Sequence, residues 1–442
     1  MELRDLIVTP LFLIVVYIIL YLVRPYATDF VTRQYFIPAV TFKILGAIAL
    51  GFIYQYYYDG GDTYSYHTHG SRQIWEAFMD SPMRGLKLLW GNENHVDVYQ
   101  YSSRIYFYND DQSYFLIRIA ALFDLLTFSS YSATAVFFAL LSFTGMWMFF
   151  LTFYSRYAHL HRGLAIAAFF LPSVFFWGSG ILKDTLAIAS LGAATYCFHE
   201  FFIRRKLSIG YAVGFILSLL IIFSVKKFIL QAFLPALLVW LVAHNFSSIK
   251  SMAAKIILVP VAALLVALGA YYMVVKVGED DERYAISRLA KTAKVTAYDI
   301  RYWSGRGAGS GYALGELDGT FESILKLAPQ AINVSLFRPY LWEVKNPLMF
   351  ISALESFCFL IFSVYTIFTV GGRLRSALSN PDVIFGLVFS LSFAFAVGVS
   401  TFNFGTLARY KIPLLPFYLM ALVVMLHYRN KPTNVDVLER TE

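Results

Sequence analysis

The chain has 442 residues, of which 58% are hydrophobic and only 14% are charged. Soluble domains carry about 25% charged residues, so this composition excludes an ordinary soluble protein and indicates a polytopic membrane protein. The net charge of +8 would suggest nucleic-acid binding in a soluble domain. Here most of the excess lies in short loops between apolar segments, as the positive-inside bias requires, and we expect no nucleic-acid partner.

Apolar segments of membrane-spanning length recur along the whole chain. A helix needs about 20 mostly apolar residues to cross a bilayer. The segments that reach or approach this length are 7–23, 36–57, 131–154, 163–179, 182–200, 208–225, 228–245, 256–275, 347–369, 383–400 and 411–427. The sequence therefore predicts a single all-α integral membrane domain over residues 1–442, with about 11 transmembrane helices.

One further apolar stretch, 114–128, is short, and Arg118 and Asp124 interrupt it. We interpret it as an amphipathic helix that lies in the membrane interface rather than as a span. Counting it as a span would place the first long loop on the same side as Arg24, against the charge pattern of the other loops.

Basic residues in alternate loops predict the orientation. They are Arg24, Arg33, Lys43, Arg156, Arg162, Arg204, Arg205, Lys206, Lys250, Lys255, Arg373, Arg375, Arg429 and Lys431. With eleven spans all of them fall on one side of the membrane, which the positive-inside rule assigns to the cytoplasm. The N-terminus is then outside and the C-terminus is cytoplasmic.

Two long polar insertions share the predicted outer face, residues 59–130 and 276–346. Loops of this length between spans are usually functional when they are ordered. Amphipathic or helical pieces are expected within both insertions, at 71–79, 83–90, 283–300 and 320–335. We therefore look for the functional site on this face.

The stretch 54–72, YQYYYDGGDTYSYHTHGSR, follows a candidate span directly and opens the first insertion. Its acidic and imidazole side chains gather around a double-glycine turn: Asp59, Asp62, His67 and His69. Asp62 is the candidate catalytic base, because the turn holds it near the membrane surface within reach of an acceptor hydroxyl. Asp59 would orient that acceptor or bind a metal.

Structural interpretations of the same residues remain open. Asp62 precedes a helical pattern and would serve as its N-cap. His67 and His69 form an H-x-H pair that, together with Asp62, could ligate a divalent metal. Such a pair is more often part of a polar surface loop, so we assign no metal ligand and leave the cofactor open.

Basic residues at outer helix ends are not explained by the positive-inside bias. They occur in GSGILKDT, SVKKF, LFRPYLWE and LARYKIPLLPF, as Lys183 (with Asp184 beside it), Lys226, Lys227, Arg338 and Arg409. One interpretation is snorkelling to lipid headgroups. The other is a phosphate site, because cations at one membrane depth suit a phosphate or pyrophosphate headgroup. Glu343 is a second acidic candidate, or the ion-pair partner of Arg338.

Four of these motifs, GGDTYSYH, SGILKD, LFRPYLWE and ARYKIPLLPF, resemble segments of the GT-C glycosyltransferases and the related O-antigen-polymerase-like proteins of bacterial surface-polysaccharide synthesis. The resemblance implies a polyprenyl-phosphate-linked sugar donor and chemistry at the outer face of the bacterial inner membrane. It also implies that Asp62 is the catalytic acid/base and that Arg409 contacts the lipid phosphate.

The sequence thus predicts a membrane glycosyltransferase or oligosaccharide polymerase. Such an enzyme needs a carboxylate for the hydroxyl proton and cations for the departing phosphate. We expect a cavity between the two insertions, with Asp62 on one wall and the outer lysines and Arg409 on the other. The alternatives are a transporter or flippase for an anionic lipid or solute, and a non-catalytic membrane subunit.

Overall fold

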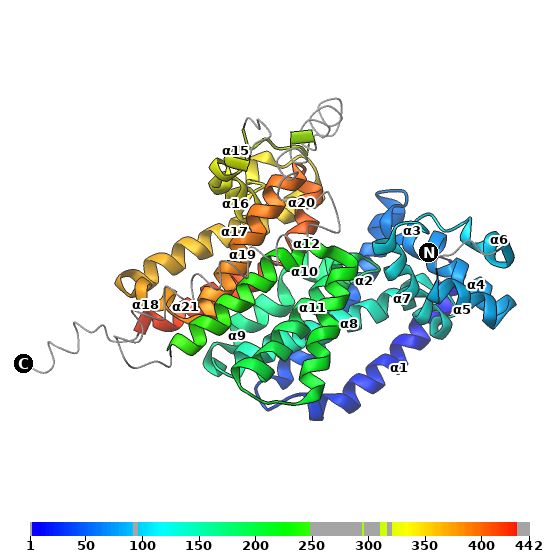
Figure 1. Ribbon diagram of the computed structural model, residues 1–442, viewed down its shortest axis with the longest axis horizontal. Coiled ribbons are helices and arrows are strands. Elements are labelled where there is room, and N and C mark those ends of the chain that lie inside the picture. Colours follow the sequence, from blue (N-terminus) through cyan, green and yellow to red (C-terminus); the bar gives the residue numbers. More distant parts are fainter. Residues whose placement is uncertain (1, 92–95, 248–293, 296–309, 316–320, 431–442) are drawn as a thin grey trace, which may run out of the picture. The chain divides into compact units, whose positions relative to one another are not determined.

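The computed structural model describes residues 2–91, 96–247, 294–295, 310–315 and 321–430. Within this part the secondary structure is helical, apart from one isolated β-bridge between Gly311 and Asn403 (Figure 1). Seven described helices are long and apolar enough to cross a membrane, and a bent pair would make an eighth. The chain is a multi-pass helical membrane protein, as its composition predicts.

The described chain forms two compact units. Unit 1 comprises residues 1–152, 174–197 and 209–226, and unit 2 comprises 153–173, 198–208 and 227–442. The helices of unit 1 are α1 (Leu3–Ala27), α2 (Arg33–Tyr56), α3 (Asp62–Tyr66), η1 (His67–Ser71), α4 (Arg72–Asp80), α5 (Pro82–Trp90), η2 (Val96–Val98), α6 (Tyr99–Ser102), α7 (Asp111–Thr127), most of α8 (Tyr131–Tyr154) and α11 (Lys183–Phe198).

Unit 2 contains the later helices. They are η3 (Ala158–Leu160), α9 (His161–Ala165), η4 (Ile166–Phe170), η5 (His199–Ile203), α15 (Phe321–Lys326), α16 (Ala328–Phe337), η6 (Leu341–Glu343), α17 (Pro347–Val370), η7 (Gly371–Arg373), α18 (Leu374–Leu378), α19 (Pro381–Thr401), α20 (Phe404–Tyr410), α21 (Leu415–Leu426) and η8 (His427–Asn430). Four of these elements pass from one unit into the other: α8 and α11 only at their last residues, and α10 (Pro172–Trp177) and α12 (Ile209–Ser247) within their length.

The predicted count of eleven spans is not confirmed, for identifiable reasons. Segment 163–179 is split between α9, η4 and α10, because Leu171 is extended and Pro172 begins a new helix. Segments 208–225 and 228–245 join in α12, which is non-helical only at Lys226. Segment 411–427 belongs to the pair α20 and α21, bent by 65°. Segment 256–275 lies outside the described residues.

Two other expectations can be compared directly with the structure. Segment 114–128 forms α7, a 17-residue helix that is not among the candidate spans. Lys43, which we expected in a cytoplasmic loop, lies instead inside α2 and is fully buried. Its place in the loop was wrong, because Lys43 falls inside the apolar segment 36–57, most of which forms α2.

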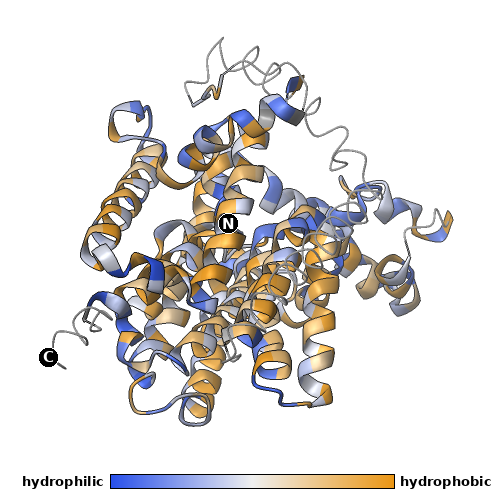
Figure 2. Cartoon of the chain, turned by 60° about the vertical axis from the view of Figure 1, so that its left-hand side comes forward, coloured by the Kyte–Doolittle hydropathy of each residue, from blue (hydrophilic) through white to orange (hydrophobic). Residues whose placement is uncertain are grey.

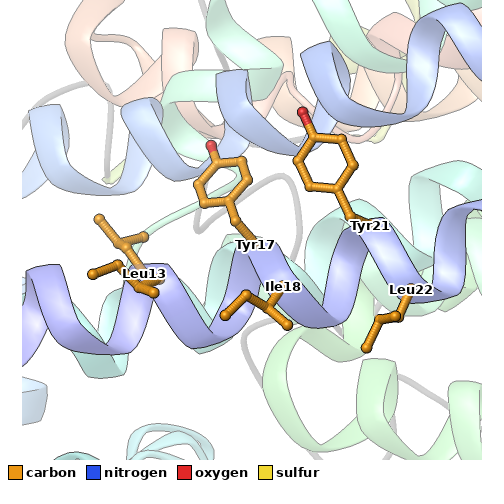
Figure 3. A pocket seen from close by; sticks show the side chains of 6 residues that line it. Leu13, Tyr17, Ile18, Tyr21 and Leu22 are labelled. Carbon is orange, nitrogen blue, oxygen red and sulfur yellow. The ribbon is translucent and has the colours of Figure 1, made fainter.

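Helix α1 exposes an apolar face. An open groove of about 620 Å³ runs along it, and the lining side chains are Leu13, Ile14, Tyr17, Ile18, Tyr21 and Leu22 (Figure 3). The Tyr17 hydroxyl is hydrogen-bonded to Thr41 Oγ1 of α2 at 2.8 Å, so the one polar atom of that side chain already has a hydrogen-bond partner. Hydrophobic residues cover much of the other long helices as well (Figure 2). Such faces suit the acyl chains of a bilayer.

Close helix packing holds α8 against α11. A Cβ atom at Gly145 would lie 2.0 Å from Ala189 O, and one at Gly192 would lie 2.1 Å from Gly145 O. Small residues let membrane helices approach this closely, which increases van der Waals contact in a solvent where the hydrophobic effect is weak. In unit 2, stacked rings have the same role: Trp240 lies parallel to Phe385 at 4.3 Å.

Candidate functional site

The double-glycine turn after α2 places the first acidic group. The chain turns at Asp59, Gly60 and Gly61, whose φ angles are 54°, 112° and 116°. Glycine tolerates such angles, whereas the aspartate adopts the left-handed region at some cost. A Cβ at Gly61 would also approach the Tyr54 ring to 3.1 Å. The turn ends α2 sharply and exposes the Asp59 carboxylate.

Asp62 begins α3 and is half-buried. Gly61 is the N-cap of this helix, and no side chain caps it. The alternative that Asp62 is an N-cap is therefore wrong, because its backbone is already inside the helix. Its position beside the turn is as the sequence predicts.

A cavity of about 310 Å³ lies beside this turn in unit 1. Its walls come from the start of α1, the end of α2, the turn, and the region from α3 to α8: Glu2, Asp5, Gln55, Asp59, Gly60, Tyr64, Thr68, Arg72 and Tyr131. Asp59 is thus the predicted site residue that lines the cavity. Glu2, Asp5 and Arg72 were missed, because nothing in the sequence indicates that the start of α1 reaches this rim.

The carboxylates of the cavity differ in their partners. Arg72 donates two hydrogen bonds to the Glu2 carboxylate, at 2.6 and 3.1 Å, and these hold the pKa of Glu2 below its ordinary value. Asp5 is buried and accepts hydrogen bonds from Ser130 Oγ at 2.8 Å and from the Ser132 backbone N–H at 3.2 Å. Asp59, among the residues that the structure describes, has neither a hydrogen bond nor an ion pair to its carboxylate.

Two stacked phenol rings form the aromatic part of the wall. Tyr64 and Tyr131 lie 4.4 Å apart and nearly parallel, at 15°. The Tyr64 hydroxyl donates to Gln55 Oε1 at 3.1 Å, and the Tyr131 hydroxyl is hydrogen-bonded to Thr63 Oγ1 at 2.8 Å. These hydrogen bonds hold both rings in place beside the double-glycine turn.

The two histidines do not converge on Asp62. His67 is fully buried, and its Nε2 lies 3.4 Å from Oδ1 of buried Asp124. His69 instead stacks on Tyr106, with the ring centroids 4.3 Å apart. In the described residues no group of three His, Cys, Asp or Glu side chains could hold a metal ion. The metal alternative therefore finds no support in this part of the chain.

Asp124 connects the short helix that carries His67 to its neighbours. It accepts hydrogen bonds from Ser71 Oγ at 2.7 Å and from Thr134 Oγ1 at 2.6 Å. It thereby ties η1 to α7 and α8, just behind the cavity residues Thr68 and Arg72. The sequence marked Asp124 only as an interruption of an apolar stretch.

The outer lysines of unit 1 each face a carboxylate. Lys183 Nζ lies 3.5 Å from Asp110 Oδ2, and Lys226 forms an ion pair with buried Asp184. Burial alone would raise the pKa of Asp110, but the Ser113 hydroxyl and Lys183 hold it below its ordinary value. Neither lysine lines the cavity. Asp184 pairs with Lys226 in this structure, and its role toward a substrate stays a prediction.

The remaining predicted residues belong to unit 2. Arg338 forms an ion pair with Glu343, as in the structural interpretation of this motif, and its guanidinium lies 5.3 Å from the Phe404 ring centroid. Lys227 and Arg409 are half-buried, and both interact with other residues. A cavity shared by these groups and Asp62 stays a prediction.

Comparison with known protein families, with curated proteins and with solved structures found no match to this chain. The class that the fold defines is a helical multi-pass membrane protein with a polar cavity at the end of one candidate span. Its activity has to be argued from that cavity.

Proposed function

We propose that this chain is a membrane glycosyltransferase, or an oligosaccharide polymerase, that takes sugar from a polyprenyl-phosphate-linked donor. We place it in the bacterial inner membrane, with the cavity of unit 1 at the outer face. One observation carries the proposal: a cavity of about 310 Å³, with Asp59 in its wall, lies at the end of candidate span α2. Small-molecule pockets start near 300 Å³, so about one sugar ring is accommodated.

The carboxylates beside the cavity supply the acid–base chemistry of the proposal. The acceptor hydroxyl oxygen bonds to the anomeric carbon, the bond from that carbon to the phosphate oxygen breaks, and the hydroxyl proton passes to a carboxylate. We keep Asp62 as the base. Asp59 is its rival, because Asp59 lines the cavity and has no competing partner among the described residues.

The departing phosphate needs cations. Lys183 and Lys226 already face Asp110 and Asp184, so a bound phosphate would have to displace a carboxylate from at least one of them. Lys227, Arg338 and Arg409 belong to unit 2 and stay separate sequence-based candidates for phosphate binding.

The test is complementation of a bacterial strain that lacks this gene, with surface and lipid-linked glycans as the readout. We expect Asp59→Asn or Asp62→Asn to reduce product by about 100-fold or more, the usual contribution of a general base. Asp97→Asn is the matched control, because Asp97 is an exposed carboxylate of the same insertion that pairs with Lys87. Full product from both variants, at equal amounts in the membrane, would refute the mechanism.

One observation favours a transporter or flippase as the second candidate. Ionisable side chains are buried within candidate spans or the bent pair: Lys43, Asp184, Lys226, Glu355, Asp382 and Lys411. Such residues often mark a transport path. Uptake or lipid translocation by the purified protein in proteoliposomes, without transfer of sugar, would favour this candidate.

A further inference from the structure

We infer that the cavity of unit 1 recognises a ligand through a positively charged amino group, such as that of an amino sugar or an ethanolamine headgroup. The inference rests on the proposed function only in treating the cavity as a substrate site. It is argued from the charges of the wall, from the partners that those charges have, and from the rings beside them.

The wall carries three carboxylates and one guanidinium: Glu2, Asp5, Asp59 and Arg72. Arg72 is bound to Glu2 through two hydrogen bonds, at 2.6 and 3.1 Å. That pair is neutral as a whole. The carboxylates of Asp5 and Asp59 therefore remain as an excess of negative charge that faces the cavity.

Asp5 is the more informative of the two. It is only 4% exposed, and its carboxylate accepts hydrogen bonds from Ser130 Oγ, from the Ser132 backbone N–H and from the Glu2 backbone N–H. All three donors are neutral. A carboxylate taken out of water normally needs a cation as well as hydrogen bonds, and no described side chain pairs with Asp5 in this way. An ammonium group in the cavity would supply that charge.

Other wall groups suit the same ligand. The rings of Tyr64 and Tyr131 line the cavity, and aromatic rings attract cations through their negative faces. The Gln55 and Thr68 side chains offer hydrogen-bonding groups to hydroxyls. By contrast, a free phosphate or a sugar acid would add negative charge beside the carboxylates of Asp5 and Asp59, and a neutral sugar would leave their charge uncompensated.

The experiment measures binding to the purified full-length chain in phosphatidylcholine nanodiscs by calorimetry. The ligands are glucosamine, N-acetylglucosamine, glucose, ethanolamine and glucose 6-phosphate. We expect glucosamine to bind at least about tenfold more tightly than N-acetylglucosamine, which keeps the ring but loses the charge. Asp59→Asn should weaken glucosamine binding, and the variant should fold, because its carboxylate is exposed. Asp97→Asn is the control and should bind as the unmodified chain does.

The arms separate the sources of the amine. Preference for glucosamine over ethanolamine supports an amino sugar, whereas equal binding, with competition by phosphatidylethanolamine in the nanodisc, supports a lipid headgroup. Equal affinity for glucosamine and glucose, or tighter binding of glucose 6-phosphate, would overturn the inference. If the unmodified chain binds glucosamine but its Asp59→Asn and Asp62→Asn variants still make full glycan product, the proposed transfer mechanism is rejected. The proposed ammonium site is then retained.

Discussion

At the scale of single residues, the buried charges of this protein are stabilised by specific polar partners. Lys43 is fully buried in α2, and its amine donates hydrogen bonds to the carbonyl oxygens of Val174 and Gly178, both at 3.0 Å. These carbonyls lie in and just after the short helix α10, where a helix end leaves carbonyls without intrahelical donors. The lysine supplies a donor, so its burial has a structural reason.

The ion pair of Arg338 and Glu343 yields a prediction about pH. Burial alone would raise the pKa of Glu343, but hydrogen bonds from Arg338 and from the Tyr340 backbone N–H hold it below its ordinary value. A carboxylate with a lowered folded-state pKa stabilises the fold above its unfolded pKa, and that contribution is lost as the pH falls through the folded pKa. Glu343→Gln should therefore lower the free energy of unfolding at pH 7, by about 1–3 kcal/mol.

The measurement is thermal unfolding of both proteins in detergent at neutral pH and at a pH well below the ordinary glutamate pKa of about 4.3, low enough to protonate a carboxylate whose pKa is lowered. The difference between them should shrink in acid. Glu322→Gln is the control, because the side chains of Glu322 and its partner Lys326 are 78% and 73% exposed. Exposed ion pairs contribute little to stability. An equal loss of stability at both pH values would contradict the electrostatic explanation.

At the scale of elements, the contact between α8 and α11 depends on the absence of side chains. A Cβ at Gly192 would lie 2.1 Å from the backbone oxygen of Gly145, and backbone cannot move aside as a side chain tip can. Alanine normally stabilises a helix by about 1 kcal/mol relative to glycine. We expect the opposite sign here: Gly192→Ala should destabilise the protein by about 1–3 kcal/mol.

Thermal unfolding of the purified variant, with the yield of monodisperse protein, checks this prediction. Gly372→Ala is the matched control, because a Cβ at Gly372 would meet nothing within 4 Å. A variant at position 192 that is as stable as the unmodified chain would show that the two helices do not pack as described.

The helices could be predicted from the sequence more fully than the candidate site could. Long apolar runs predict helices well, because hydrophobicity over about 20 residues is a local property. The break of segment 163–179 depends on Pro172, and the bend near Lys411 depends on local backbone geometry. Hydrophobicity alone does not show either feature, so the count of eleven spans is not confirmed. The polar turn at Asp59 was visible locally, whereas its neighbours Glu2 and Asp5 come from the start of α1 and become visible only in the fold.

At the scale of the whole molecule, the orientation of the chain is still a prediction that can be tested. Opposite sides for the two termini require an odd number of crossings, which eleven satisfies. The seven described candidates with the bent pair make up to eight, so segments 163–179, 208–245 and 256–275 decide the parity. We expect a C-terminal fluorescent fusion to be fluorescent in the cytoplasm, and alkaline phosphatase inserted within 91–96 to be active outside.

The parity result also bears on the proposed chemistry. The cavity lies at the end of α2 from which the first insertion leaves, so activity of the phosphatase at this site places the cavity on the face where polyprenyl-linked sugars would be used. A phosphatase inserted after Asp29, between α1 and α2, is the control and should be inactive. If that fusion were active and the fusion in the first insertion inactive, the cavity would face the cytoplasm. The outer-face mechanism would then fail, and the ammonium site could still be tested by ligand binding.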